Sequence, residues 1–232
     1  KSGRKQGRWI KRYPGGTIMY DGIFRDDKPV GEFKRYYEDQ TLKSLLIFND
    51  SGTEALAILY YQNGNVASKG KYINQLKEGK WQFFSVSNKN VLIGDEGYLN
   101  DKRNGLSRRF YPDSTIAEVI SFRNDVKNGE WVNYHPGGSV NFRTNYSNGK
   151  LNGKFEAFFS DGKPEVLGHY KNGLRDGEWL IYNENGSQRF KIEYSGGIAK
   201  NKDFDIYQSD YVDSLEKNMV KIPDPEKTGK IW

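Results

Sequence analysis

The chain has 232 residues, of which 35% are hydrophobic and 15% aromatic, and its mean hydropathy is −0.86. So few apolar residues exclude a single large aliphatic core, and so many aromatic residues exclude a disordered chain. The formal net charge of +6 does not by itself indicate a nucleic-acid partner, and the absence of cysteine excludes disulfides and cysteine-ligated zinc. No apolar run reaches the roughly 18 residues that a membrane-spanning helix needs.

A period of 24 residues runs along the chain. Each unit begins with a glycine, and an aromatic residue or a serine follows two positions later. These pairs are Gly7 and Trp9, Gly31 and Phe33, Gly79 and Trp81, Gly105 and Ser107, Gly129 and Trp131, Gly153 and Phe155, and Gly177 and Trp179. Ala55 and Ala57 stand where the third unit would have its glycine and tryptophan. Eight units are therefore predicted.

A second aromatic residue lies 17 positions after each unit's start. The column consists of Phe24, Phe48, Tyr72, Tyr98, Phe122, Tyr146, Tyr170 and Tyr194. One spacing is two residues longer than the others in both columns, and we predict that the insertion lies in the turn Ser85–Asn90.

Two turn signals divide each unit. One is a tip, such as Pro136-Gly137-Gly138, and the other joins neighbouring units, such as Asn148-Gly149. These residues tolerate the positive φ that tight hairpin turns require. Between the turns, the second strand alternates with a period of two, as in a half-buried antiparallel strand. We predict one β-hairpin per unit. Trp131 and Tyr134 lie three positions apart, which indicates a bulge whose place the sequence does not give.

The opposite face of the second strand changes along the chain. Early units carry Met19, Ile23, Leu45 and Ile47 there, whereas late units carry polar residues such as Arg143. An apolar face of this extent needs a cover. Either a first-strand residue, a loop or a terminal segment covers it, or it is a partner surface.

Both ends of the chain depart from a simple array. Residues 1–7 match residues 147–153 in their glycine spacing, which indicates that the chain begins inside the last turn of an upstream unit. A ninth unit begins near Asn201 and decays, and Ser209–Lys221 has nearly helical spacing, so we predict a terminal cap there. The predicted domains are therefore a hairpin array over residues 1–207, and a cap with an extended tail over 208–232.

At these residues the sequence resembles the MORN repeat family, in its bacterial variant, over about residues 1–200. The unit from Gly129 to Gly153 carries the resemblance well, whereas the unit Thr53–Glu78 departs from it. We expect the first strand of that unit to be distorted or to serve an interface. The resemblance implies an all-β fold, an elongated single-layer antiparallel sheet of stacked hairpins with an aromatic-lined groove. The alternative fold for this period is a parallel β-helix.

The sequence offers little chemistry beyond this architecture. His135 lies in a tip and His169 in a second strand, and these different positions within their units argue against a shared metal site. The carboxylates of Asp26-Asp27, Asp95-Glu96, Asp176 and Glu178 are expected at or near turns, where turn formation explains them better than acid–base catalysis. We expect no catalytic site, no metal and no cofactor.

The resemblance implies a non-catalytic scaffold for protein partners. The candidate groove residues, which are structural in the first place, are Trp9, Tyr13, Phe33, Trp81, Trp131, Phe155 and Trp179. Alternatives are a glycan- or anionic-lipid-binding module, an antitoxin-like binding protein, and a non-catalytic part of a larger enzyme. We do not expect nucleic acid as a partner, and we expect peripheral membrane contact at most. The Lys, Asn and Tyr content resembles Bacteroidota cell-envelope proteins. It favours an accessory subunit of a cell-surface or secretion assembly, in the periplasm or at the surface, with the cytoplasm as the alternative.

Overall fold

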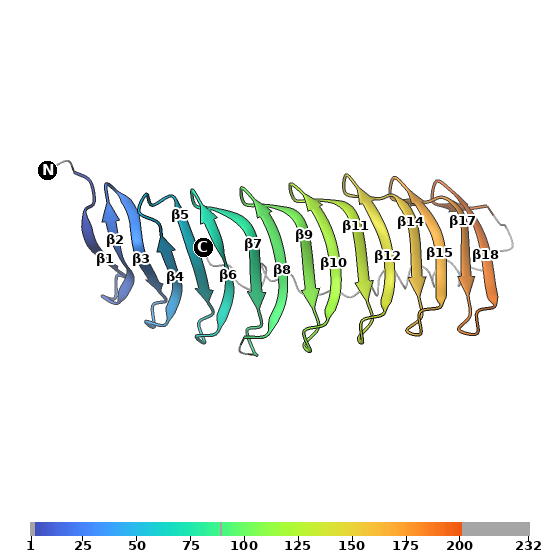
Figure 1. Ribbon diagram of the computed structural model, residues 1–232, viewed down its shortest axis with the longest axis horizontal. Coiled ribbons are helices and arrows are strands. Elements are labelled where there is room, and N and C mark those ends of the chain that lie inside the picture. Colours follow the sequence, from blue (N-terminus) through green and yellow to red (C-terminus); the bar gives the residue numbers. More distant parts are fainter. Residues whose placement is uncertain (1–2, 89, 201–232) are drawn as a thin grey trace. The chain divides into compact units, whose positions relative to one another are not determined.

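The computed structural model describes residues 3–88 and 90–200, and these residues form strands, turns and irregular segments (Figure 1). Nineteen strands belong to one sheet, and every strand pair is antiparallel. This pairing confirms the predicted antiparallel sheet of hairpins and excludes the parallel β-helix. Within the described residues, no helix has the length and apolar character needed to cross a membrane.

The strands form eight successive hairpins and begin a ninth. They are β1 (Gly7–Arg12), β2 (Ile18–Arg25), β3 (Lys28–Tyr36), β4 (Leu42–Phe48), β5 (Glu54–Tyr60), β6 (Val66–Ile73), β7 (Leu76–Phe84), β8 (Leu92–Leu99), β9 (Lys102–Phe110), β10 (Ile116–Arg123), β11 (Val126–Tyr134), β12 (Val140–Ser147), β13 (Lys150–Leu151), β14 (Gly153–Phe158), β15 (Pro164–Lys171), β16 (Leu174–Arg175), β17 (Gly177–Tyr182), β18 (Gln188–Ser195) and β19 (Ile198–Ala199). The predicted cap over Ser209–Lys221 lies outside the described residues.

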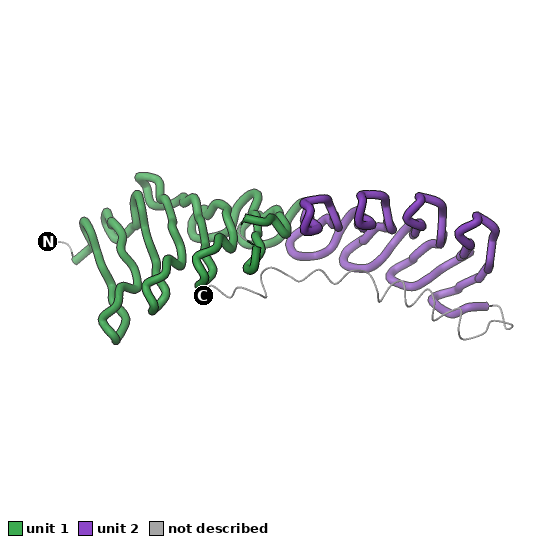
Figure 2. Tube along the Cα trace, turned by 90° about the horizontal axis from the view of Figure 1, so that it is seen from below, with its two compact units in different colours: residues 1–105, 224–232 green, residues 106–223 purple. Residues whose placement is uncertain are grey.

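The described residues fall into two compact units, residues 3–105 and residues 106–200 (Figure 2). Each unit has its own core of inward-facing aromatic and aliphatic side chains. In the first unit, Trp81, Tyr72 and Leu59 belong to one buried cluster. In the second unit, Phe155 and Trp179 belong to another.

Tight turns join most hairpins. In the β12–β13 turn, Asn148 and Gly149 have φ values of 49° and 80°, which is the pattern of a type I′ turn. Tip turns close with a four-residue spacing, as in the 2.8 Å hydrogen bond that the Tyr13 backbone N–H donates to the Thr17 carbonyl. The β7–β8 tip is two residues longer. Its closing hydrogen bond, of 2.8 Å, is donated by the Ser85 N–H to the carbonyl of Val91, six positions later. The predicted insertion is therefore confirmed.

The repeat glycine lies in a β-bulge. Between β10 and β11 the register changes from Ile120 opposite Trp131 to Phe122 opposite Lys127. Over this stretch β11 has two residues more than β10, and Gly129, with a φ of 111°, lies among the extra residues. A side chain at this φ would be strained, so glycine is needed. A second register shift, between Asn133 and Tyr134, is the bulge that the spacing of Trp131 and Tyr134 predicts.

The β5–β6 hairpin lacks the glycine bulge. Ala55 pairs with Phe48 and Leu59 with Ser44 in one unbroken register, so the expectation of a distorted first strand is wrong. The two residues that other hairpins place in the bulge are found here in the turn between β4 and β5, which the Asn49 N–H closes by donating to the Glu54 carbonyl at 3.0 Å. Because the bulge has moved into the turn, alanine is tolerated at the glycine position.

Candidate binding pocket

One face of the sheet carries the repeat aromatics, and we call it the inner face. Most candidate groove residues are buried in it: Trp81 and Trp179 are 0% exposed, Phe155 is 1%, Phe33 is 6% and Trp131 is 8%. Trp9 is 42% exposed, and Tyr13, near the tip, is half-buried. The buried rings fill the spaces between strands.

On the inner face, some of the large rings pack over a glycine of a neighbouring strand. A Cβ atom on Gly168 would lie 2.3 Å from Cδ2 of Trp179, and one on Gly70 would lie 2.2 Å from Cδ2 of Trp81. These rings can therefore pack only because their neighbours lack side chains. Between β4 and β5 the order is reversed, because Leu46 is opposite Ala57.

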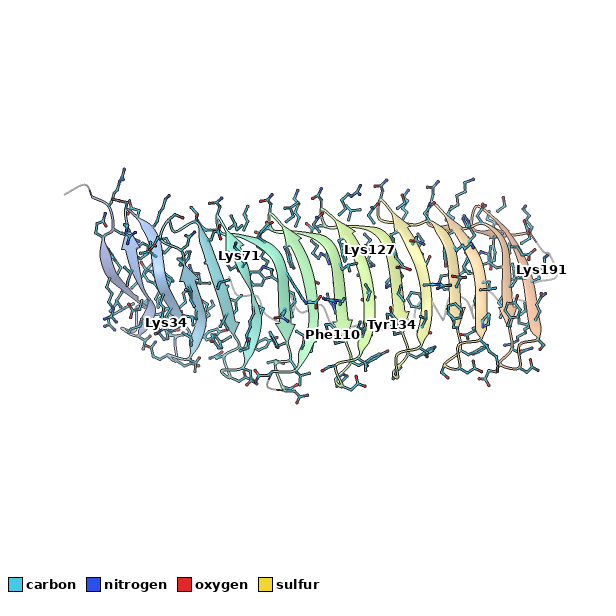
Figure 3. All side chains as sticks on the ribbon, in the orientation of Figure 1. Lys34, Lys71, Phe110, Lys127, Tyr134 and Lys191 are labelled. Carbon is cyan, nitrogen blue, oxygen red and sulfur yellow. The ribbon has the colours of Figure 1, made fainter. Side chains whose placement is uncertain are left out.

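A column of cations that the sequence reading did not find covers the aromatic rings. These cations lie two positions before a repeat glycine. The Nζ atom of Lys77 is 5.2 Å from the ring centre of Trp81 and 4.7 Å from that of Tyr98. Lys127, labelled in Figure 3, lies 5.1 Å from Trp131 and 4.9 Å from Tyr146. Alignment of the units on the 24-residue period could have revealed this column, which is interrupted by Pro29 and Thr53 in two consecutive hairpins and again by Leu151.

A pocket of about 310 Å³ opens beside two of these departures from the repeat, Pro29 and Leu46, which both line it. Its apolar walls come from the inner faces of β2 to β6 and consist of Tyr20, Phe24, Phe33, Leu46, Phe48, Ala55, Leu59 and Tyr72. Pro29 and Gly52 form part of its lining. A Cβ on Gly52 would lie 2.7 Å from the Pro29 carbonyl oxygen, so the long β4–β5 turn packs closely on β3. The backbone at this edge of the pocket is therefore closely packed, which limits the reorganisation that binding requires there.

The charges of the pocket are all positive. Among the described residues that line it, Lys5, Arg35 and Lys43 are cations and none is a carboxylate. The Nζ atom of Lys5 lies 4.8 Å from the ring centre of Phe24, and the guanidinium carbon of Arg35 lies 5.8 Å from that of Phe33. Cations beside apolar walls attract an anion more strongly than they would in open water.

The outer face of β4 and β5 is aliphatic and open. Ile23 and Ile47 are each 46% exposed, whereas Met19 and Leu45 are half-buried. Ile47 pairs with Leu56, which is 60% exposed. The predicted apolar face is therefore covered in part, at Met19 and Leu45, and exposed at Ile23 and Ile47.

The two histidines take part in hydrogen bonds that hold the hairpins together. The ring of His135 bonds through Nε2 to the Phe158 carbonyl at 2.9 Å, a place that tyrosine hydroxyls take in other hairpins, as in the 2.6 Å bond from Tyr111 to the Tyr134 carbonyl. His169 lies on β15, where its backbone carbonyl accepts a hydrogen bond from Trp179 Nε1 at 3.3 Å. Both histidines thus take part in the hydrogen bonding of the hairpins, and neither belongs to a candidate metal cluster in the described part of the chain.

Two carboxylates contradict the expectation that acidic residues lie at turns. Asp95 and Glu96 are in the middle of β8 and are 2% and 1% exposed. Glu96 accepts a 2.6 Å hydrogen bond from the Tyr98 hydroxyl, and Asp95 lies 3.1 Å from Lys80 Nζ. The flanking Gly94 and Gly97 resemble turn residues in sequence, but here they extend the strand.

The remaining carboxylates lie closer to the expected places. Asp26 and Asp27 form a type I′ turn, with φ values of 51° and 67°. Asp176 lies just before β17, and Glu178 lies in β17 beside Lys191 (Figure 3).

Comparison with known proteins identifies the repeat. Three segments match the family model described as MORN repeat variant, at residues 54–74, 127–148 and 151–172. The first segment covers the whole β5–β6 hairpin, which therefore matches the repeat type although it lacks the glycine and the tryptophan. A search of curated proteins finds no match to this chain.

Proposed function

For this chain, which carries repeats of the MORN variant type, we propose a non-catalytic protein-binding function with the pocket across β2–β6 as the binding site. The observation that carries the proposal is the coincidence of the pocket with the departures from the repeat. Pro29, which interrupts the cation column, lines the pocket, and so does Leu46, which pairs with the Ala57 that replaces the repeat aromatic.

The energetics of the array favour a binding role over an accidental defect. An unfilled apolar site in a packed core lowers stability, and an array could fill it with the aromatic residue found in most other units. The pocket instead retains aromatic walls and positive charges, the mixture that recognition sites use. The open aliphatic strip at Ile47 and Leu56 lies on the opposite face of the same strands and is the competing site for a protein partner.

The amino-acid composition favours a place for this module in the bacterial cell envelope. We extend the proposal to an accessory subunit of a bacterial cell-surface or secretion assembly, because the Lys, Asn and Tyr content supports it. In such an assembly the module would hold a second protein in place and would carry out no reaction.

Affinity capture with two matched variants tests the proposal. The full chain is used as bait in native envelope extracts, beside the double variant Leu46→Gly/Ala57→Trp, which copies the packing of Trp179 over Gly168 and is designed to place an indole against the pocket. The control Leu56→Trp adds the same side chain on the outer face of the same strand. Circular dichroism checks that each variant keeps its strand content.

We expect one or more proteins to be recovered with the parent chain and with Leu56→Trp, but not with the filled variant. Loss of recovery with Leu56→Trp alone would move the site to the outer face. Saturable binding to anionic vesicles or to glycans, with no protein recovered, would overturn the protein-binding function itself.

A further inference from the structure

We propose that the occupant of this pocket is an acidic polypeptide segment that inserts one aromatic side chain between the walls. This inference rests on the proposed function and specifies its partner. The partner's ring lies against the lining side chains Phe33, Leu46 and Phe48, and its carboxylates face the three cations.

The apolar part of the pocket suits a ring. Phe33 and Phe48 already meet edge-to-face with centres 6.2 Å apart, and Phe24 meets Phe33 at 5.8 Å in the same geometry. An entering indole or phenol can add to this cluster, because aromatic rings prefer edge-to-face and offset arrangements. The volume of about 310 Å³ accommodates one large side chain and not a row of bases.

The polar part of the pocket selects the charge of the segment. Lys5, Arg35 and Lys43 lie in the lining, and the Nζ atom of Lys43 is 5.5 Å from the ring centre of Tyr37. Approach of a lysine-rich or arginine-rich segment is opposed by three like charges. Approach of an aspartate- or glutamate-rich segment is favoured, and such complementarity acts mainly on the association rate and on specificity.

The position of the cations fixes how the segment is built. Lys5 precedes β1, Arg35 lies near the tip end of β3, and Lys43 lies near the start of β4, so the cations come from both ends of the strands. The apolar wall residues Phe33 and Leu46, which pair in mid-strand, lie between these ends. An aromatic residue with carboxylates on both sides matches this arrangement better than a single terminal carboxylate does.

Fluorescence polarisation of the full chain with synthetic peptides tests the inference. The probe is a labelled peptide with one tryptophan between two pairs of aspartates. Three matched peptides replace the tryptophan by alanine, replace the aspartates by asparagines, or replace the aspartates by lysines. A labelled single-stranded oligouridylate tests nucleic acid in the same assay.

We expect saturable binding of the acidic tryptophan peptide. The alanine peptide should bind at least about 30-fold more weakly, as expected for an anchor residue, and the asparagine peptide about tenfold more weakly at low salt. Affinity should fall as ionic strength rises. Equal binding of the alanine or lysine peptide, or preference for the oligouridylate, would overturn the inference.

Protein variants locate the peptide on the surface. Lys5→Gln/Lys43→Gln should weaken binding about tenfold at low salt, whereas Lys69→Gln, an exposed lysine on the outer face, should leave it unchanged. Undiminished binding to Lys5→Gln/Lys43→Gln would contradict the assignment.

The two proposals can fail separately. If affinity capture depends on the pocket but no acidic peptide binds, the protein-binding function stands and the acidic occupant is wrong. If the filled variant does not fold, the peptide series still decides the matter, because it leaves the protein unchanged.

Discussion

The inner face across β11–β18 and the inner face across β3–β6 are built on the same hairpin but are packed differently. Across β11–β18 the rings follow one another: Trp131 meets Phe142 at 4.7 Å, and Phe155 meets Trp179 at 5.5 Å. Across β3–β6, Phe33 pairs with Leu46 and Leu46 pairs with Ala57, so the ring is followed by two aliphatic side chains. The pocket opens beside Phe33 and Leu46. The backbone ladder continues through both regions, so the fold tolerates the exchange of an inner-face ring for space. A repeat array can therefore specialise one hairpin without altering its neighbours.

Removal of a buried aromatic ring from the inner face across β11–β18 should lower stability most. Trp179→Ala deletes a 0% exposed indole that contacts Phe155, Tyr170 and Tyr194. We expect the free energy of unfolding in urea to fall by about 3–5 kcal/mol. Trp9→Ala, at a 42% exposed site, should cost much less. Equal losses at the two sites would show that burial does not distinguish the repeat aromatics.

Addition of one methyl group tests how closely the inner face across β11–β18 is packed. Gly168→Ala would bring a Cβ to 2.3 Å from Trp179, and we expect a loss of about 1–3 kcal/mol from overpacking. The control Gly15→Ala has its nearest neighbour at 4.0 Å and should change stability by less than about 0.5 kcal/mol. Urea denaturation measures both, and a neutral Gly168→Ala would mean that the indole has room to shift.

A double-mutant cycle converts one region into the other. Leu46→Gly alone removes a wall, and Ala57→Trp alone forces an indole against Leu46, so each should destabilise the chain. Combined, they reproduce the Gly168 and Trp179 arrangement, and we expect a favourable coupling of about 0.5–3 kcal/mol in the free energy of unfolding. Additive effects would indicate that the two positions do not share space.

The tip hydrogen bonds should contribute equally beside the pocket, at the β3–β4 tip, and away from it, at the β9–β10 tip. Tyr37→Phe removes the 2.8 Å bond to the Tyr60 carbonyl, and Tyr111→Phe removes the 2.6 Å bond to the Tyr134 carbonyl. Each change should lower the free energy of unfolding by about 1 kcal/mol. A difference of several-fold between the two variants would show that the pocket weakens the hairpin as far as its tip.

Acidification should have the smallest effect on stability, at the β3–β4 tip and at the β9–β10 tip alike. The Thr41 hydroxyl and then the Gln62 amide lower the pKa of Asp39, and the Thr115 hydroxyl and backbone N–H lower the pKa of Asp113. A carboxylate with a lowered folded-state pKa stabilises the fold above its unfolded pKa of about 4, and this contribution is lost as pH falls through the folded pKa. Asp39→Asn or Asp113→Asn should therefore reduce the loss of thermal stability between about pH 6 and pH 2. An unchanged pH profile would contradict this account.

Much of the fold could be predicted from local signals. The glycine spacing, the Asn-Gly turns and the alternation in the second strand indicate hairpins, because turn geometry and side-chain direction are properties of a few adjacent residues. The insertion at Ser85–Asn90 follows from the same counting. The burial of Asp95 and Glu96 could not be predicted, since flanking glycines favour a turn and only the pairing of the whole strand opposes it.

The pocket was less predictable than the hairpins. Ala57 was visible as a missing tryptophan, but a missing ring need not leave a space, because Leu46 on the next strand takes part of it. The cation column was present in the sequence, although its meaning depends on rings that come from strands up to 21 residues away. Such relations between strands are not visible within a single unit.

The sequence by itself determined the repeat, the hairpin and the position of its turns, because a residue's tolerance for positive φ and its polarity act over a few neighbours. The tertiary structure decided which aromatic residues are buried, where the glycine bulge gives way to a longer turn, and where a pocket remains. Those outcomes depend on how side chains from adjacent strands share a fixed space about 4.8 Å wide, and no single strand specifies its neighbour's volume.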